Sequence, residues 1–426
     1  MLKRSLCLVG GLAMATGSVS AQIYADVKTT KGTFTMQLYY QTAPRAVANF
    51  IRLAEGSSYW LDPSNGLLKK EPYYNGLKFH RVLQGVVSQA GARVDEPTDD
   101  GPGYTFRDEM GIPGAVDRFW LVYMDNIGPN TNRARFFMTA SSAPVTYSAH
   151  TLFAQVNNDP QASDPYASRK VCYDINQVAV DDEWKPVDDV IIEEVSIRRV
   201  GASAQAFDEH GQDLPQMAPL AFSLLDPKGD ASLEMEMPPG SLTRLSYSGD
   251  LNDWQQEPSR LLSGASEAES AWDVSSLIGD ASNMFFHVSQ VKFPANSVYW
   301  PDQLKGRDMQ IATNVVPEVS GQIGTSTVYR FSSESGGTAY NAVGAGAFNV
   351  KVQSRHWLGS AMEFETPYSC IYNGKVHTMK YRLHLGVDSM SLSNYSGRIR
   401  GSLVLFRGGE ERASFGVTGT LSITST

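Results

Sequence analysis

The chain has few cysteines, few histidines and no cluster of basic residues. Its 426 residues include 36 Lys and Arg against 45 Asp and Glu, which gives a formal net charge of −9. An acidic chain without a basic cluster is poorly suited to nucleic acid or to an anionic membrane surface, so we expect neither as a partner. The seven histidines are scattered and none has the spacing of metal ligands, so we expect no metal site.

Long apolar runs are absent beyond the first 21 residues. Lys3 and Arg4 precede a short apolar run there, and small residues up to Ala21 provide a cleavage site. This pattern is typical of a secretory signal peptide, since the run is too short and wrongly flanked for a spanning helix. We expect a signal peptide at 1–21 and an exported protein of bacterial type, periplasmic or extracellular. Its removal leaves 34 basic against 45 acidic residues, a net charge of −11, and no integral membrane segment.

Only Cys172 and Cys370 remain in the mature chain, far apart in the sequence. They could pair in an oxidising compartment, but two free thiols in separate domains are the favoured interpretation.

Glycine and proline are plentiful, whereas long helical patterns are few. The 37 Gly and 21 Pro favour a mainly β protein, and 426 residues are enough for two or three domains. The sequence predicts a first domain at 22–203, a small polar linker at 204–219, a small β module at 220–304 and a C-terminal β domain at 305–426. Two-residue alternation and glycine-rich turns in the last part favour one or two modules of the β-sandwich or barrel kind.

The first domain begins with clear local signals. Residues 24–40 read as a hairpin that turns at Lys31-Gly32, because apolar residues alternate on its second arm. Pro44 and Gly56 are start and stop signals of a helix between them. Residues 57–74 are rich in turn formers and read as a long loop.

Four motifs then follow in order: "FHRV" (79–82), "GPGYTFRDEM" (101–110), "MDNIGPNTNRARFFM" (124–138) and "HTLFAQV" (150–156). Taken together with the hairpin and the helix, they resemble the cyclophilin family of peptidyl-prolyl isomerases over about residues 24–200. The resemblance is specific because several motifs occur in order at suitable distances. It implies an eight-stranded closed β-barrel with flanking helices.

The resemblance also implies a catalytic arginine, Arg81, and proline-containing polypeptides as substrates. Rotation about an X–Pro bond needs no covalent intermediate, metal or cofactor, only tighter binding of the twisted amide than of either planar isomer. The same resemblance implies five substrate-binding residues. His80 would support the groove, Gln89 would orient the arginine, and Asn126 would hold the residue before proline. Phe137 would line the proline pocket, and His150 would close it. The implied role is assistance in the folding of exported proteins.

Several groove residues depart from the family pattern. Val86 and Val87 stand where an aromatic and a Met are usual, and Val145 lies near the place of a missing large residue. Arg135 replaces a groove Gln and joins the substrate-binding set, and Asp125 replaces a small residue. Arg135 could pair with Asp125 or compete for the carbonyl that Arg81 should bind. The loss of apolar area is expected to weaken substrate binding by about 1–2 kcal/mol.

Two alternatives follow from these departures and from the C-terminal half. The first domain could be a catalytically weak or inactive peptide-binding scaffold, with residues 220–426 as an envelope or adhesion module. The tail could instead bind carbohydrate, an alternative that rests on its β-richness and aromatic residues. The sequence leaves the partner of the C-terminal part unknown.

Overall fold

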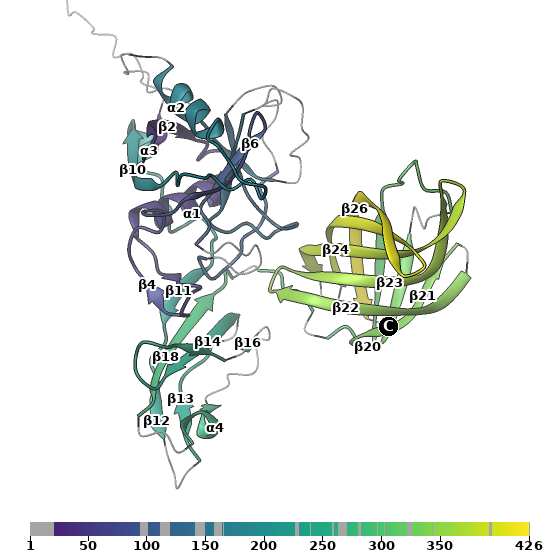
Figure 1. The fold of residues 1–426 in the computed structure, drawn as a ribbon. Coiled ribbons are helices and arrows are strands. Elements are labelled where there is room, and N and C mark those ends of the chain that lie inside the picture. Colours follow the sequence, from purple (N-terminus) through teal and green to yellow (C-terminus); the bar gives the residue numbers. More distant parts are fainter. Residues whose placement is uncertain are drawn as a thin grey trace, which may run out of the picture.

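The structure is a computed structural model, and it is built mainly of β-strands (Figure 1). It describes residues 21–93, 101–110, 120–140, 150–156, 164, 166–225, 230–238, 240–257, 260–262, 271–279, 283–295, 297–301, 303–321, 326–342, 344–391 and 394–425. The expected signal peptide and Val145 therefore lie outside the described residues, apart from Ala21. Among the described residues, no helix has both the length and the apolar character needed to cross a membrane.

An eight-stranded antiparallel sheet forms the N-terminal part, as the sequence predicts. Its strand order is β10-β1-β2-β9-β7-β8-β6-β5. The strands are β1 (Gln22–Thr29), β2 (Gly32–Leu38), β5 (Phe79–Leu83), β6 (Val87–Ala90), β7 (Leu121–Met124), β8 (Phe136–Thr139), β9 (Leu152–Val156) and β10 (Ile192–Val200). The two edges of the sheet come together at one end, because Phe79 N donates to Val190 O at 2.9 Å and Ile192 N donates to Leu77 O at 2.8 Å. The sheet is therefore strongly curved, although β5 and β10 do not pair along their length.

Helix α1 (Pro44–Glu55) packs against this sheet, and both of its predicted ends are confirmed. Pro44 stands at the first helical position, and Gly56 ends the helix with a left-handed φ of 64°. The ring of Phe50 on this helix packs against three aromatic rings of the core, those of Tyr74, Phe136 and Phe153. Two further helices, α2 (Ala167–Asn176) and α3 (Ala202–Gln205), belong to the same part.

The expected loop at 57–74 contains a small hairpin, β3 (Trp60–Leu61) and β4 (Leu68–Lys69). This segment contacts the next part of the chain: Ser246 Oγ donates to Gly66 O at 3.1 Å, and Leu68 N donates to His287 Nε2 at 3.3 Å. The long loop therefore serves as a packing surface.

Two small sheets make up the middle of the chain. The larger sheet contains β11 (Gln216–Pro219), β14 (Ser241–Ser248), β15 (Gln255–Gln256), β16 (Arg260–Leu262) and β18 (Phe285–Lys292). The smaller sheet contains β12 (Ser223–Leu225), β13 (Ser232–Glu234) and β17 (Ala271–Asp273). Helix α4 (Ser275–Ile278) follows β17. Leu233 and Trp272 of the smaller sheet share a buried cluster with Leu245 and Val288 of the larger one. The two sheets therefore pack face to face.

A closed eight-stranded barrel forms the C-terminal part. Its strands follow the chain order and close through pairing of the first with the last. They are β19 (Arg307–Thr313), β20 (Thr327–Ser333), β21 (Gly336–Asn341), β22 (Gly344–His356), β23 (Gly359–Tyr372), β24 (Lys375–Ser391), β25 (Asn394–Arg407) and β26 (Glu410–Ser425). Aromatic rings, among them those of Tyr329, Phe348 and Phe364, fill its interior. We call this part the C-terminal barrel.

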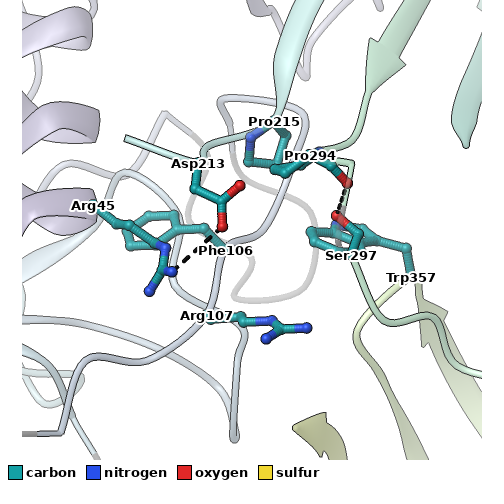
Figure 2. A pocket seen from close by; sticks show the side chains of 8 residues that line it. All are labelled: Arg45, Phe106, Arg107, Asp213, Pro215, Pro294, Ser297 and Trp357. Atoms are coloured by element: carbon teal, nitrogen blue, oxygen red, sulfur yellow. Dashed lines mark hydrogen bonds and ion pairs between the residues drawn. The ribbon is translucent and has the colours of Figure 1, made fainter. Parts of the chain in front are cut away.

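The three parts meet around a small pocket (Figure 2). Arg45 and Arg107 of the N-terminal part line it together with Asp213, and Trp357 of the C-terminal barrel lies on the opposite side. Both thiols lie elsewhere: Cys172 is buried in α2 and Cys370 in β23, and neither forms a disulfide.

Candidate active site

Arg81 lies on β5 with its guanidinium fixed by a neighbour on the next strand. A register shift between Phe79 and Arg81 breaks the two-residue alternation of the strand, so that Phe79 and Val82 are both buried while Arg81 stays half-exposed. Arg81 Nη1 donates to Gln89 Oε1 at 2.9 Å. Gln89 therefore lies within hydrogen-bonding distance of Arg81, and its orienting role stays a prediction.

The side chains that follow Arg81 form a row across four adjacent strands. Arg81 stands opposite Gln89, Gln89 opposite Phe137, and Phe137 opposite Tyr123. Residues directly opposite each other share one face of a sheet. The sheet therefore places a charged donor at one end of the row and two aromatic rings at the other.

Asp125 and Arg135 form an ion pair beside this row, which answers the question that the sequence left open. The Arg135 Nη2–Asp125 Oδ2 distance is 2.8 Å, and Arg135 Nε donates to the same oxygen at 3.0 Å. Gln89 Nε2 also donates to Asp125 Oδ2, at 3.2 Å. Arg135 is thus held by a carboxylate, and the same carboxylate turns the carbonyl oxygen of Gln89 toward Arg81.

The apolar wall consists of Phe137 and the rings around it. Phe137 is 3% exposed and stacks on Tyr123 at 5.2 Å between ring centroids, while the imidazole of His150 meets its edge at 5.2 Å. Val87 is buried in β6, whereas Val86 in the preceding turn is 37% exposed. The structure therefore places the two expected pocket residues together and adds Tyr123, which the sequence did not single out.

His150 uses both of its ring nitrogens. A guanidinium can only donate, so His150 Nε2 accepts from Arg400 Nη1 at 3.2 Å, and Nδ1 donates to Met124 O at 3.1 Å. Burial, with the nearby charge of Arg400 as the second cause, lowers the pKa of His150 from 6.5 to about 4. His150 is therefore neutral at pH 7.

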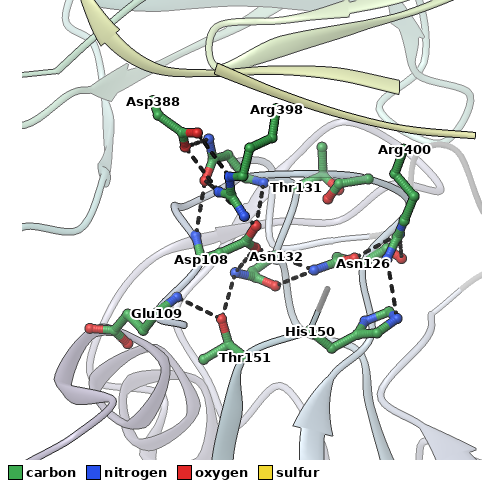
Figure 3. A network of polar contacts seen from close by, with 12 residues as sticks. Asp108, Glu109, Asn126, Thr131, Asn132, His150, Thr151, Asp388, Arg398 and Arg400 are labelled. Carbon is green, nitrogen blue, oxygen red and sulfur yellow. Dashed lines mark hydrogen bonds and ion pairs between the residues drawn. The ribbon is translucent and has the colours of Figure 1, made fainter. Parts of the chain in front are cut away.

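Asn126 begins a tightly bonded loop that runs to Asn132 (Figure 3). Asn126 Nδ2 donates to Asn132 Oδ1 at 3.0 Å, and Asn132 Nδ2 donates to Asp108 Oδ1 at 2.9 Å. Asp108 Oδ2 accepts from the backbone of Asn130, which has a left-handed φ of 59°. These bonds explain why the motif at 126–132 carries so many amide side chains: they replace the backbone ladder that an irregular loop lacks.

Two arginines of the C-terminal barrel reach this loop, and the sequence did not reveal them. Arg400 Nη2 donates to both oxygens of Asn126, to O at 3.0 Å and to Oδ1 at 2.9 Å. Arg398 pairs with Asp108 at 3.2 Å and donates to Asn130 Oδ1 at 3.1 Å (Figure 3). Because they are two residues apart on β25, they lie on one face of the strand. This spacing of two arginines is the sequence feature that could have pointed to a contact surface here.

Trp184 is a second residue that the sequence did not single out. Trp184 is 49% exposed, and its ring lies 5.1 Å from the guanidinium carbon of Arg81. The loop holds Trp184 at a φ of 62°, and its carbonyl accepts from Val82 N at 2.8 Å. Such a conformation is costly for a bulky side chain. His80, the remaining predicted residue, is half-buried next to Arg81 in β5.

Comparisons with known proteins show what the N-terminal part of the chain is similar to. Residues 24–197 match the family described as "Cyclophilin type peptidyl-prolyl cis-trans isomerase/CLD". The chain is 34% identical to "Peptidyl-prolyl cis-trans isomerase B" of Streptomyces anulatus over 180 residues, which are 42% of this chain and 98% of that protein. It is also 34% identical to "Peptidyl-prolyl cis-trans isomerase A" of Mycobacterium tuberculosis over 43% of this chain and 96% of that protein. A crystal structure of a Cryptosporidium parvum cyclophilin type isomerase is 23% identical and covers 42% of this chain and 98% of that one, with a TM-score of 0.33. Residues 80–150 and Trp184 lie inside the matched range, whereas Arg398 and Arg400 lie outside it.

Proposed function

Because the chain belongs to the cyclophilin-type peptidyl-prolyl cis–trans isomerase family, we propose that Arg81 is its catalytic residue and that it acts on proline-containing polypeptides. The activity is isomerisation of the X–Pro bond. The observation that supports the assignment is the row of Arg81, Gln89 and Phe137 on adjacent strands, with His150 at the edge of the phenyl ring.

The barrier to rotation is about 18–20 kcal/mol, because twisting the bond removes amide resonance. In the twisted state the prolyl nitrogen regains a lone pair and accepts a hydrogen bond better than a planar amide does. A fixed donor aimed at that region therefore binds the transition state more tightly than either isomer, and this difference in binding is the catalysis. Arg81 supplies a permanently charged, planar donor for this purpose.

The neighbours of Arg81 keep it in place. Gln89 Oε1 accepts from Nη1, and the Trp184 ring lies beside the guanidinium carbon. Both contacts reduce the side-chain entropy that Arg81 would lose on binding substrate. Trp184 and Gln89 are therefore positioning residues in this proposal, and Phe137 with His150 forms the surface for the proline ring.

The thinner pocket at Val86 and Val87 remains a reason to expect weak substrate affinity. Arg135 gives no reason to expect weak affinity, because its pairing with Asp125 keeps it from the carbonyl that Arg81 binds. We therefore propose an enzyme whose KM is high, while its catalytic donor is intact.

An exchange assay on an Ala-Pro-containing peptide with the full chain tests the proposal. Arg81→Ala is expected to lower kcat/KM by about a hundredfold, the usual loss for one transition-state donor. Arg81→Lys is expected to recover little, because an ammonium does not reproduce the planar fork. Thermal melting of each variant checks that the fold is kept. Equal rates for wild type and Arg81→Ala would favour the alternative function, a peptide-binding scaffold without catalysis.

We further propose that the protein is exported and that it therefore acts on exported polypeptides. Lys3, Arg4, the apolar run and the small residues up to Ala21 support this proposal. The N-terminal sequence of the protein isolated from its cell of origin tests it. A mature chain that begins at Gln22 is expected, and a chain that retains residues 1–21 contradicts it.

A further inference from the structure

The C-terminal barrel contacts the end of the groove that Asn126 and His150 form. Arg400 of the barrel contacts the groove directly. One of its nitrogens donates to both oxygens of Asn126, and another donates to His150 (Figure 3). By the resemblance to the cyclophilin family, Asn126 is expected to hold the backbone of the substrate residue before proline. The acceptors that a substrate N–H would use are therefore already taken by a side chain of the same molecule.

The contact extends well beyond Arg400. Asn130 Nδ2 donates to Val387 O at 2.9 Å and to Asp388 Oδ1 at 2.8 Å. Arg398 links Asp388 to the buried Asp108, so the charges of the barrel and of the loop alternate across the interface. Complementary charge of this kind fixes register and orientation between two surfaces.

The backbones also approach closely at one point. Gly386 on β24 lies against Pro129 of the loop, and a Cβ at residue 386 would come within 2.6 Å of the Pro129 side chain. A residue other than glycine at 386 would push the two surfaces apart. The two surfaces are therefore complementary in shape as well as in charge.

We propose that the C-terminal barrel is an intramolecular ligand of the isomerase groove, in which Arg400 competes with the substrate backbone for Asn126. The inference rests on the proposed function of the groove. A polypeptide gains the Asn126 acceptors only when β25 moves away, so the barrel raises the KM for substrate. The polar character of the interface suits such a contact, because water can replace each hydrogen bond when the barrel leaves.

Steady-state kinetics on the full chain tests the competition. Arg400→Ala is expected to lower KM for an Ala-Pro peptide by about tenfold and to change kcat little, since a hydrogen bond to a charged group contributes on the order of a factor of ten in binding. Asp388→Ala loosens the same interface without touching Asn126 or His150 and is expected to shift KM in the same direction.

Arg382→Ala is the matched control. Arg382 also lies on the barrel, where it pairs with Glu363 at 2.9 Å and with Glu411 at 3.1 Å. Its replacement removes an arginine and two ion pairs from the barrel but nothing from the groove. Kinetic constants equal to those of wild type are expected.

The outcomes separate this inference from the proposed function. If Arg400→Ala and wild type catalyse with the same KM, the competition is overturned while the isomerase assignment stands. If neither catalyses, the assignment fails, and a peptide titration followed by NMR still decides the competition. Tighter peptide binding by Arg400→Ala supports competition, and unchanged or weaker binding overturns it.

Discussion

At the scale of single residues, the site depends on one carboxylate that the family pattern does not contain. Asp125 accepts hydrogen bonds from Gln89 and Arg135 on the same oxygen. The amide of Gln89 has a donor end and an acceptor end, so the bond to Asp125 decides that the acceptor end faces Arg81. Asp125 and Arg135, which both depart from the family pattern, therefore act as a pair: each provides the charge that neutralises the other.

Asp125→Ala is expected to lower kcat by about tenfold, since it frees Gln89 to turn and leaves Arg135 without its carboxylate. Asp125→Ala combined with Arg135→Gln should recover most of the rate, because the unpaired guanidinium is removed as well. Exchange kinetics on the three proteins measures both effects. A double variant as slow as the single one would show that Arg135 does not interfere when unpaired.

Trp184 offers a second test at this scale. A cation–π contact at an exposed site contributes about 0.5–1 kcal/mol, so Trp184→Ala is expected to lower kcat/KM about two- to fivefold. Trp184→Phe should retain part of the effect, because phenylalanine offers a weaker π face. Trp254→Ala, which changes a tryptophan just before β15, is the control. If both alanine variants behave alike, Trp184 has no positioning role.

At the scale of elements, the ends of α1 show how far local signals reach. Pro44 and Gly56 fix the helix from the sequence alone, because each residue has a backbone preference that needs no tertiary partner. The other contact at its start could not be predicted: Glu109 accepts from Arg45 N at 3.1 Å and from Ala46 N at 3.0 Å. That capping carboxylate comes from a distant motif, and only the fold brings it to the helix.

Gly56→Ala is expected to destabilise the protein more than Gly76→Ala. Both glycines have a left-handed φ, 64° and 82°, so each substitution carries a conformational cost of about 1–2 kcal/mol. A Cβ at residue 56 would also lie 2.4 Å from the carbonyl carbon of Glu71, whereas a Cβ at residue 76 meets nothing within 4 Å. Overpacking should therefore add about 1–3 kcal/mol at residue 56 only. Urea unfolding of the two variants measures the difference, and equal midpoints would contradict the steric explanation.

At the scale of the whole molecule, the family pattern led to candidate residues that lie within one part of the chain. Arg81, Gln89, Phe137 and His150 lie near one another because the order of the motifs sets the order of the strands, and their roles stay predictions. Arg400 could not be found in this way, since its role depends on how two independently patterned β units dock. The pairing of Arg135 was open for a similar reason: charge alone allows two partners, and only the cross-strand geometry selects one.

The docking of the C-terminal barrel is expected to weaken as the pH falls from 7 to 5. Burial and Arg400 lower the pKa of His150 to about 4 in the docked protein, against 6.5 for an ordinary histidine. Asp125, the other charged group near His150, acts in the opposite direction and is the weaker influence. His384 on β24 faces Arg400 as well, and burial followed by that charge lowers its pKa too.

The sign follows from proton uptake. Below about pH 6.5 the undocked state binds more protons at these two histidines than the docked state does, because docking lowers the pKa of both, so protons favour release of the barrel. The stability that neutral His150 gives to docking is complete above that pH and is lost as the pH falls toward 4. Small-angle scattering of wild type should therefore show a larger radius of gyration at pH 5 than at pH 7. Arg400→Ala should show a weaker dependence, because the cation that opposes protonation is gone. A wild-type His150 that titrates near 6.5 by NMR, with the same radius at both pH values, would show that the barrel does not sense this proton.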